Sequence, residues 1–335
     1  KKDTAEYGHF QDVLMRFKKN PHIESVEPNY TVEAYAAPND PYYSTSGSWG
    51  QAYEDLWGLK KMNLEPAWEQ TTGSQAIVVA VIDTGVSRDH EDIKDNMWVN
   101  TGEIPLNGID DDANGYIDDY QGWDFVNNDA DPTDDHGHGT HVAGTIAGLG
   151  NNAIGVVGVN WVSKIMALKF LNANGSGYLD DGITALQYAA DMEARISSNS
   201  WGAGITSLAM DDAVKYEHDR GMVVVAAAGN SNSDALSFSP ASADDAITVA
   251  ASNYSDQKAS FSNWGEKIDV ASPGVDILSL RAPGTDMYRD GGTHFVPTGN
   301  PTAKYYRASG TSMTCPHTAG LAALLLARAP FLSNE

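Results

Sequence analysis

Apolar residues along the chain alternate between continuous runs and helically spaced positions. Four continuous apolar runs predict strands: residues 76–82, 164–169, 222–228 and 246–251. Segments 181–195 and 207–220 lie between them and predict helices, the second followed by Gly221 as a C-terminal cap. Apolar strands that alternate with helices are typical of a parallel sheet covered on both faces. We therefore predict an α/β fold of three layers, α/β/α, with a mostly parallel central sheet.

The first 37 residues have a different pattern and predict a small α+β unit. Four apolar residues between positions 10 and 17 have the spacing of an amphipathic helix over residues 9–20. A strand-like run, 23–32, follows. The sequence Ala-Ala-Pro-Asn-Asp-Pro at 36–41 is small, polar and rich in proline, which is typical of a linker. We place the boundary there, giving units 1–37 and 38–335.

The charge of the chain narrows the class of partner. Its 335 residues include 21 Lys and Arg against 45 Asp and Glu, a net charge of -24. This charge repels phosphate backbones and anionic lipids, so we expect divalent cations as partners and no nucleic acid. The single cysteine, Cys315, excludes a disulfide framework and a four-thiolate zinc site, and we expect it to be a buried thiol. No run approaches the ~20 apolar residues of a membrane span.

Three short segments that contain glycine carry an Asp, a His and a Ser. Asp83 follows an apolar strand, His138 begins the sequence His-Gly-Thr-His-Val-Ala-Gly, and Ser312 lies in Gly-Thr-Ser-Met at the start of a helix. A serine hydroxyl becomes a strong nucleophile when an imidazole can take its proton and a carboxylate holds that imidazole. The three residue types together therefore indicate nucleophilic catalysis.

Each segment alone has another interpretation. Asp-Thr-Gly can form half of an aspartic protease site, but that enzyme needs two such loops and the sequence contains one. His136, His138 and His141 have the close spacing of a zinc site, so a zinc-dependent hydrolase stays open as an alternative. Ser312 can be a helix N-cap. A catalytically silent calcium-binding interaction module is the second alternative.

Together, in the order Asp, His, Ser, the motifs resemble those of the subtilisin-like serine peptidases, the subtilases, from about residue 40 onwards. The resemblance implies a serine endopeptidase that works through an acyl-enzyme intermediate. Asp83 would orient His138, His138 would act as general base and then general acid, and Ser312 would attack the peptide carbonyl. The sequence Ala-Ala-Ala-Gly-Asn that ends at Asn230 resembles the segment that supplies the family's oxyanion donor.

Two further segments resemble those between which subtilases bind an extended peptide as an added antiparallel strand. The implied substrate-binding residues are Gly175, Ser176, Gly177, Ser200, Trp201 and Gly202. Trp201 would form the wall of a pocket several residues before the scissile bond. Ser231 places no charge at the primary pocket, so we expect broad specificity with a preference for uncharged apolar or aromatic residues there.

Three segments rich in oxygen ligands predict one to three structural Ca²⁺ sites. The first places oxygens at alternate positions, with Gln121 in place of a final Glu: Asp110, Asp112, Asn114, Tyr116 and Asp118. The second resembles a calcium loop that some subtilases carry before the catalytic histidine: Asp124, Asn127, Asp129, Asp131 and Thr133. The third resembles the tight site of subtilisins and thermitases: Asp40, Asp92 and Asn152 with the carbonyls of Gly150, Ile154 and Val156. At each, a turn without metal is the alternative.

Residues 1–37 resemble the last part of a subtilase propeptide. The resemblance implies a zymogen whose own propeptide is an inhibitory partner, with cleavage between about Tyr35 and Asn39. The chain stops soon after the Ser312 helix, where subtilases usually continue, so we expect a C-terminal truncation. The resemblance also implies a monomer that is secreted or held at the cell surface and acts on polypeptide substrates.

Overall fold

The computed structural model describes residues 13–26, 37–285, 287, 295–296 and 302–334. The chain divides into two compact units, Lys1–Tyr35 and Ala36–Glu335. In the first unit, residues 13–18 are helical, within the predicted helix 9–20. Residues 23–26 of the predicted strand do not form a β-strand, and the remainder of that prediction lies outside the described residues.

A seven-stranded parallel sheet forms the centre of the second unit, so the predicted fold class is confirmed. In spatial order the strands are β2 (Gly122–Asp124), β3 (Lys164–Lys169), β1 (Val78–Asp83), β4 (Ile196–Asn199), β5 (Val223–Ala227), β6 (Ala246–Ser252) and β7 (Val270–Pro273). All four predicted strands are present among them. A small antiparallel sheet lies beside it: β8 (Ile277–Leu280), β10 (Tyr305–Ala308) and β9 (Phe295–Val296).

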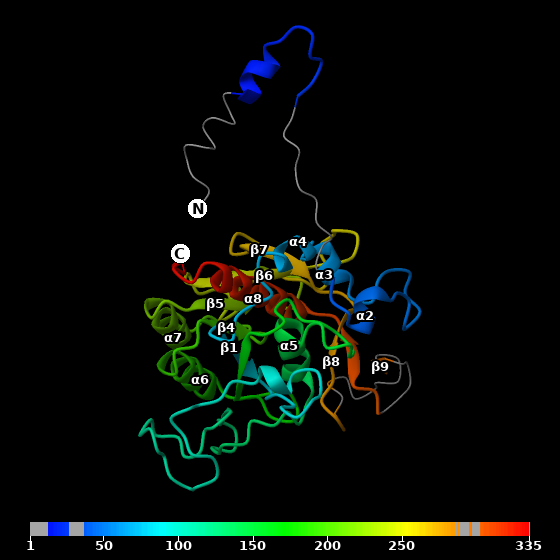
Figure 1. Cartoon of the computed structure of the whole chain (residues 1–335). Coiled ribbons are helices and arrows are strands. Elements are labelled where there is room, and N and C mark those ends of the chain that lie inside the picture. The colour runs from blue at the N-terminus through cyan, green and yellow to red at the C-terminus, as the bar shows by residue number, and fades with distance from the viewer. Residues whose placement is uncertain (1–12, 27–36, 286, 288–294, 297–301, 335) are drawn as a thin grey trace. The chain divides into compact units, whose positions relative to one another are not determined.

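Helices cover both faces of the sheet, as Figure 1 shows. The long ones are α5 (His138–Ala147), α6 (Leu179–Asp191), α7 (Leu208–Asp219) and α8 (Thr311–Arg328). The short ones are α2 (Pro41–Ser44), α3 (Trp57–Lys61), α4 (Glu65–Trp68), η1 (Lys94–Asn96) and η2 (Ala235–Ser237). Along β1, Val79 and Val81 pack into the core with α5 and α8, whereas Ala80 and Ile82 pack into the core with α6 and α7. The alternation of a strand's side chains thus produces the three layers.

The ends of the predicted helices have local causes. Helix α7 begins after Ser207, whose hydroxyl accepts from the backbone N–H of Met210 at 3.3 Å, and Gly221 follows it with φ of +82°. Helix α6 ends four residues before the predicted end at residue 195. Glu193 has φ of +58°, which turns the chain out of the helix and into β4.

The strand order reverses at β1, because β3 lies on one side of it and β4 on the other. In open α/β sheets, ligands bind at the carboxyl ends of the strands next to such a reversal. Asp83 is the last residue of β1, Ser200 follows β4, and Asn230 lies just after β5. The topology therefore gathers three of the predicted site residues at one edge of the sheet.

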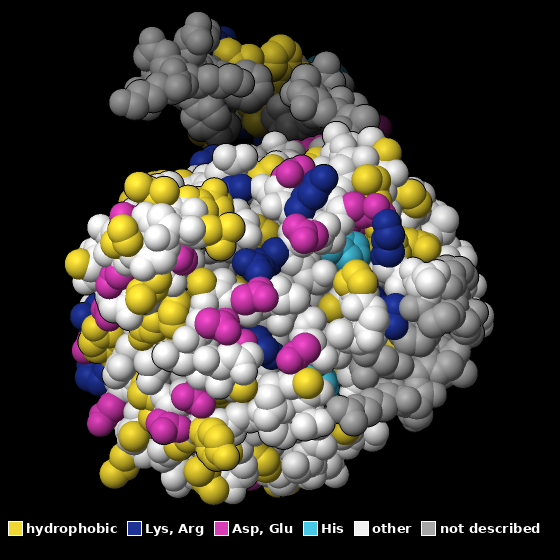
Figure 2. Space-filling model, turned by 90° about the horizontal axis from the view of Figure 1, so that it is seen from below, with side chains coloured by type: hydrophobic (Ala, Val, Ile, Leu, Met, Phe, Trp, Pro, Cys, Tyr) yellow, Lys and Arg dark blue, Asp and Glu magenta, His cyan; other side chains and the backbone are white. Residues whose placement is uncertain are grey.

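Acidic side chains are spread across the face of the molecule that Figure 2 shows. On this face they are not gathered into one patch. Among the helices of the described residues, none is both long enough and apolar enough to cross a membrane.

Candidate active site

Asp83 and His138 lie in hydrogen-bond contact at the carboxyl edge of the sheet. Asp83 is fully buried at the end of β1, and its Oδ1 is 2.7 Å from Nδ1 of His138, the first residue of α5. Burial lowers the pKa of His138, but the charge and the hydrogen bond of Asp83 outweigh it, so that this pKa lies above its ordinary value. The pair therefore holds an imidazole that can accept and carry a proton.

The chain before α5 fixes the position of His138. Gly137 has φ of +106°, a backbone conformation that favours glycine. The buried carboxylate of Asp134 accepts hydrogen bonds from the backbone N–H groups of His136, Gly137 and Thr140 at 2.8 to 3.0 Å. These bonds satisfy backbone donors at the beginning of α5, so the first turn of the helix presents His138 in one orientation.

Ser312 is the second residue of α8 and forms two hydrogen bonds with Ser200. The Ser312 hydroxyl donates to the Ser200 carbonyl at 2.9 Å, and the Ser200 hydroxyl donates to the Ser312 carbonyl at 3.0 Å. Pro316, four residues further on, lacks the N–H that would bind the Ser312 carbonyl within the helix. The proline thus leaves that carbonyl open to Ser200, and the reciprocal bonds join the start of α8 to the segment after β4.

The side chain of Asn230 is oriented by Thr311. Its Oδ1 accepts from the backbone N–H of Thr311 at 2.8 Å and from the Thr311 hydroxyl at 3.0 Å. Both donors face the oxygen, so the amide N–H₂ group is left to bind another acceptor. A Cβ built on Gly310 would lie 3.6 Å from that nitrogen, so the amide group is beside the residues that lead into Ser312.

A cleft of about 460 Å³ opens beside His138 and contains all six predicted substrate-binding residues. It is lined by Gly175, Ser176, Gly177, Ser200, Trp201 and Gly202 together with Thr84, His136, His138, Phe170, Leu171, Tyr178, Leu179, Ala203 and Ile205. Trp201 packs edge-on against Phe170, with ring centroids 4.7 Å apart, and these two form an aromatic wall. His136 was not among the predicted binding residues. Its nearness to His138 in the sequence was the available signal.

The structure does not bring the three histidines together on one point. His138 is bound to Asp83, whereas Nε2 of the fully buried His141 lies 3.0 and 3.1 Å from the carbonyls of Ile277 and Tyr306. Burial lowers the pKa of His141 to about 3, so it is neutral. Within the described part of the chain, the metal-ligating side chains that converge in threes are all carboxylates. This geometry does not favour the zinc alternative.

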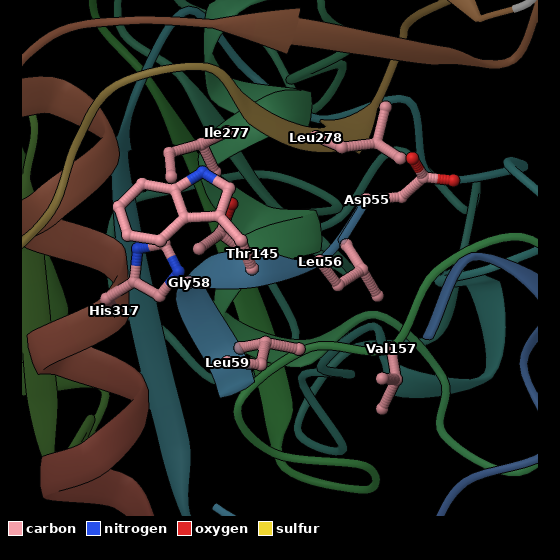
Figure 3. Close-up of a pocket in the computed structure, with 10 residues that line it drawn as sticks. Asp55, Leu56, Gly58, Leu59, Thr145, Val157, Ile277, Leu278 and His317 are labelled. Carbon is pink, nitrogen blue, oxygen red and sulfur yellow. The ribbon is translucent and has the colours of Figure 1, made fainter. Parts of the chain in front are cut away.

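A second hollow, shown in Figure 3, is small and internal. It lies between α3 and α8, where Gly58 and His317 face each other, and its volume is about 10 Å³. That is the size of one water molecule. Burial lowers the pKa of His317 to about 4, and its Nδ1 is bound to the Met313 carbonyl at 2.7 Å. This hollow is too small to bind a substrate.

The model of the Subtilase family matches residues 74–335, most of the chain. The chain is a subtilase. It is a serine endopeptidase of that family and acts on polypeptides.

Relatives of this subtilase cover nearly all of its length. It is 39% identical over 323 residues to the thermophilic serine proteinase of Bacillus sp. (strain AK1), covering 96% of this chain and 68% of that one. It is 35% identical to thermitase of Thermoactinomyces vulgaris, covering 89% and 88%. It is 36% identical to a halolysin-like extracellular serine protease of Natrialba magadii, covering 93% and 50%. The crystal structure of a cold adapted subtilisin-like serine proteinase matches with a TM-score of 0.62 and 31% identity, covering 83% of this chain and 87% of that one.

Two of the predicted calcium ligands in this subtilase form a buried acidic pair. Asp40 and Asp92 are both fully buried. The pKa of Asp92 is raised to about 7, mainly because the carboxyl group is buried. The charge of Asp40 also raises this pKa, whereas hydrogen bonds from Asn152 and Val156 lower it. Backbone N–H groups of Asn151 and Asn152 donate to Asp40 at 2.7 and 3.4 Å. Two buried carboxylates that repel each other fit a divalent cation.

The first predicted calcium loop has a different set of converging carboxylates. Glu103, Asp112 and Asp119 have ligand oxygens within 4.8 Å of one another, and Asn100 donates to both Asp112 and Asp119. Asp118 instead accepts from backbone N–H groups of the same loop. Of the predicted set, only Asp112 belongs to this group. Glu103 and Asp119 were missed because they lie outside the alternating positions of the loop.

In the second predicted calcium loop, a guanidinium group faces the oxygens. Arg88 donates to the Asp131 carboxylate and, at 3.0 Å, to the Thr133 hydroxyl. Asp124 is buried, and it accepts from the backbone N–H and the side-chain amide of Asn127. Asp131 and Thr133 thus already contact a cation of the protein. This arrangement supports calcium less well than the other two segments.

Proposed function

We propose that this subtilase hydrolyses peptide bonds through an Asp83–His138–Ser312 triad with Asn230 as the oxyanion donor. The contact of 2.7 Å between the buried Asp83 and His138 carries the proposal, since it supplies a held base at the edge of a peptide-sized cleft. Ser312 at the start of α8 and the oriented amide of Asn230 support it.

The residues act in a fixed order. His138 takes the hydroxyl proton as Ser312 attacks the peptide carbonyl, and Asp83 stabilises the imidazolium that results. The amide of Asn230 and the backbone N–H of Ser312 at the helix N-terminus donate to the developing oxyanion. His138 then gives its proton to the leaving amine, which leaves an acyl-enzyme that water hydrolyses by the same route.

The cleft accounts for how a substrate is held. An extended peptide would pair as a strand between residues 175–177 and 200–202, which gives affinity through main-chain bonds of low sequence selectivity. The aromatic wall of Phe170 and Trp201 suits an apolar side chain upstream of the scissile bond. Ser231 adds no charge, so we propose a preference for uncharged apolar or aromatic residues at the primary pocket.

We also propose the biological setting. Residues 1–37 would belong to an inhibitory propeptide, which the helix at residues 13–18 and the linker after it support. The subtilase would be a monomer that is secreted or held at the cell surface. The name of the Natrialba magadii relative, an extracellular protease, supports that localisation.

A serine-directed fluorophosphonate is expected to abolish casein hydrolysis, whereas the zinc chelator phenanthroline is expected to leave it unchanged. The reason is that the reagent reacts covalently with the activated Ser312 hydroxyl, whereas no step of this mechanism uses zinc. The measurement is the initial rate with millimolar Ca²⁺ present. Loss of activity with phenanthroline alone would favour the zinc hydrolase, and no hydrolysis in any sample would favour the silent module.

Calcium is proposed to stabilise the fold through Asp40 and Asp92, with Asn152 and the nearby carbonyls, and through Glu103, Asp112 and Asp119. Adding Ca²⁺ to chelated protein is expected to raise the melting temperature by about 5 °C or more, because a ligand at 100 times its Kd stabilises the native state by about 2.7 kcal/mol. The measurement is a thermal melt of an inactive Ser312→Ala chain, which prevents self-digestion.

Three variants separate the calcium segments. Asp40→Asn and Glu103→Gln are each expected to reduce the calcium-dependent shift. Asp131→Asn, in the loop where Arg88 supplies the cation, is the matched control and should retain the whole shift. Absence of any shift in the unaltered chain would remove the calcium proposal. If only Asp131→Asn reduced the calcium-dependent shift, the calcium site would instead be assigned to residues 124–133.

A further inference from the structure

We propose that Lys169 is a positioning residue of the active site, whose buried ammonium joins the segments that carry Asp83, His138 and the cleft-lining Leu171. The role rests on the proposed triad, and it concerns a side chain that neither the sequence motifs nor the mechanism above uses. Lys169 is the last residue of β3 and is only 1% exposed. It lies directly opposite Asp83 in the pairing of β3 with β1.

All three N–H bonds of the ammonium find acceptors. Nζ of Lys169 donates to the Thr84 carbonyl at 3.0 Å, to the Leu171 carbonyl at 2.8 Å and to the Asp135 carboxylate at 2.7 Å. A lysine ammonium has three donors, so these bonds satisfy it completely. The acceptors belong to three separate segments of chain, and a single buried group therefore sets their spacing.

The bond to Thr84 reaches both Asp83 and the beginning of α5. The Thr84 N–H donates to Oδ1 of Asp83 at 2.7 Å, the same oxygen that binds His138. The Thr84 hydroxyl accepts from the N–H of Gly139 at 2.9 Å and donates to Asp134 at 2.8 Å. A shift of the Thr84 peptide would therefore displace the carboxylate and the helix that position the imidazole.

The other two bonds reach the cleft and the loop before His138. Leu171 lines the cleft, and its N–H donates to the Asp83 carbonyl at 3.1 Å. Asp135 comes three residues before His138, and its side chain is 50% exposed. It supplies the charge partner that a buried ammonium needs, since an unpaired buried cation is costly. The carboxylate of Asp124, at the end of β2, is a second negative group near Lys169.

Apolar packing alone does not require a charge at this position. A methionine of similar length fills the same space without the cost of removing an ammonium from water. It cannot donate to the carbonyls of Thr84 and Leu171. The ammonium group adds three hydrogen bonds, and each acceptor belongs to a segment that lines or positions the candidate active site.

Steady-state kinetics of Lys169→Met with two substrates test the role. With a short ester and with an extended peptide, kcat is expected to fall by about 10- to 100-fold, the effect of misplacing catalytic groups by about an ångström. KM is expected to rise only for the extended peptide, which reaches residues 171–177. Lys169→Arg keeps the charge and donors in another geometry and should recover part of the loss in kcat.

Lys164→Met is the matched control, because Lys164 begins the same strand and donates to the Asp95 carbonyl at the surface, at 2.6 Å. It should leave kcat within about twofold of the unaltered chain. If Lys169→Met does not fold, the test uses Asp135→Asn, because this change removes only the half-exposed charge partner of Lys169. For that variant kcat should fall by about two- to fivefold with KM unchanged.

Two results would overturn the proposal. One is a folded Lys169→Met with kcat within twofold of the unaltered chain. The other, where that variant cannot be folded, is an Asp135→Asn with unchanged kcat. Activity retained in Ser312→Ala would instead remove the triad, so failure of the mechanism and failure of the role of Lys169 give different results.

Discussion

Replacing Ser312 with alanine is expected to lower kcat for a peptide substrate by on the order of 10⁶, the loss known for the corresponding serine of subtilisin. The reason is that the acyl-enzyme cannot form without the hydroxyl, and His138 then has no nucleophile to deprotonate. The measurement is the turnover of an extended chromogenic peptide at saturating concentration. A residual rate about 10³ to 10⁴ above that of water would remain from the oxyanion site and from binding.

The control for Ser312→Ala is the affinity of this variant for the same substrate. KM or Kd should change little, because the cleft beside Ser200 is built by other residues. The double variant Ser312→Ala, His138→Ala should lose scarcely more than the single one, because the two residues act as a unit. Turnover at the unaltered rate in Ser312→Ala would show that another residue is the nucleophile.

Replacing Asn230 with alanine is expected to lower kcat by about 10² to 10³, a figure taken from the corresponding asparagine of subtilisin. The side-chain oxygen is occupied by the two donors of Thr311, so the amide nitrogen is the group that is left to donate to a developing oxyanion. Because negative charge on the substrate oxygen appears only as the transition state forms, KM should be nearly unchanged. The measurement is kcat and KM with the same peptide.

Asn232→Gly supplies the matched control for Asn230→Ala. Asn232 lies two residues further along the same loop, its side chain is exposed and bound by Lys258, and its φ of +48° suits glycine. It should leave kcat within about twofold. A fall of less than about fivefold in Asn230→Ala would assign the oxyanion site to backbone groups alone.

The sequence predicted the layers of the fold where apolar runs were long. Strands β1, β3, β5 and β6 are continuous apolar segments, and the sequence shows them directly. Strand β4 was missed because three of its four residues are Ser197, Ser198 and Asn199. Two of their side chains donate inside the protein: the Ser197 hydroxyl donates to Glu217 of α7 at 2.5 Å, and the Asn199 amide donates to the Ser197 hydroxyl at 3.0 Å. Glu217 itself has the sequence context of a surface helix residue and yet is fully buried.

The candidate site divides in the same way. The segments that carry the proposed triad are short and local, so their residue types could be identified from the sequence. The proposed calcium sites depend on which carboxylates converge, and that is set by tertiary contacts. Arg88 reaches Asp131 across 43 positions of the chain, and Glu103 approaches Asp119 only once the loop between them has folded. The spacing of residues along the sequence does not predict such contacts.

The paired bonds between Ser200 and Ser312 have a consequence for the resting enzyme. A hydroxyl has one proton, and in the free protein Ser312 directs it to the Ser200 carbonyl instead of to His138. A peptide bound as a strand along residues 200–202 would bring its own N–H donors to carbonyls of that segment. A bound substrate strand would then compete for the Ser200 carbonyl and turn the Ser312 proton towards His138, so binding of the peptide would itself prepare the proton transfer.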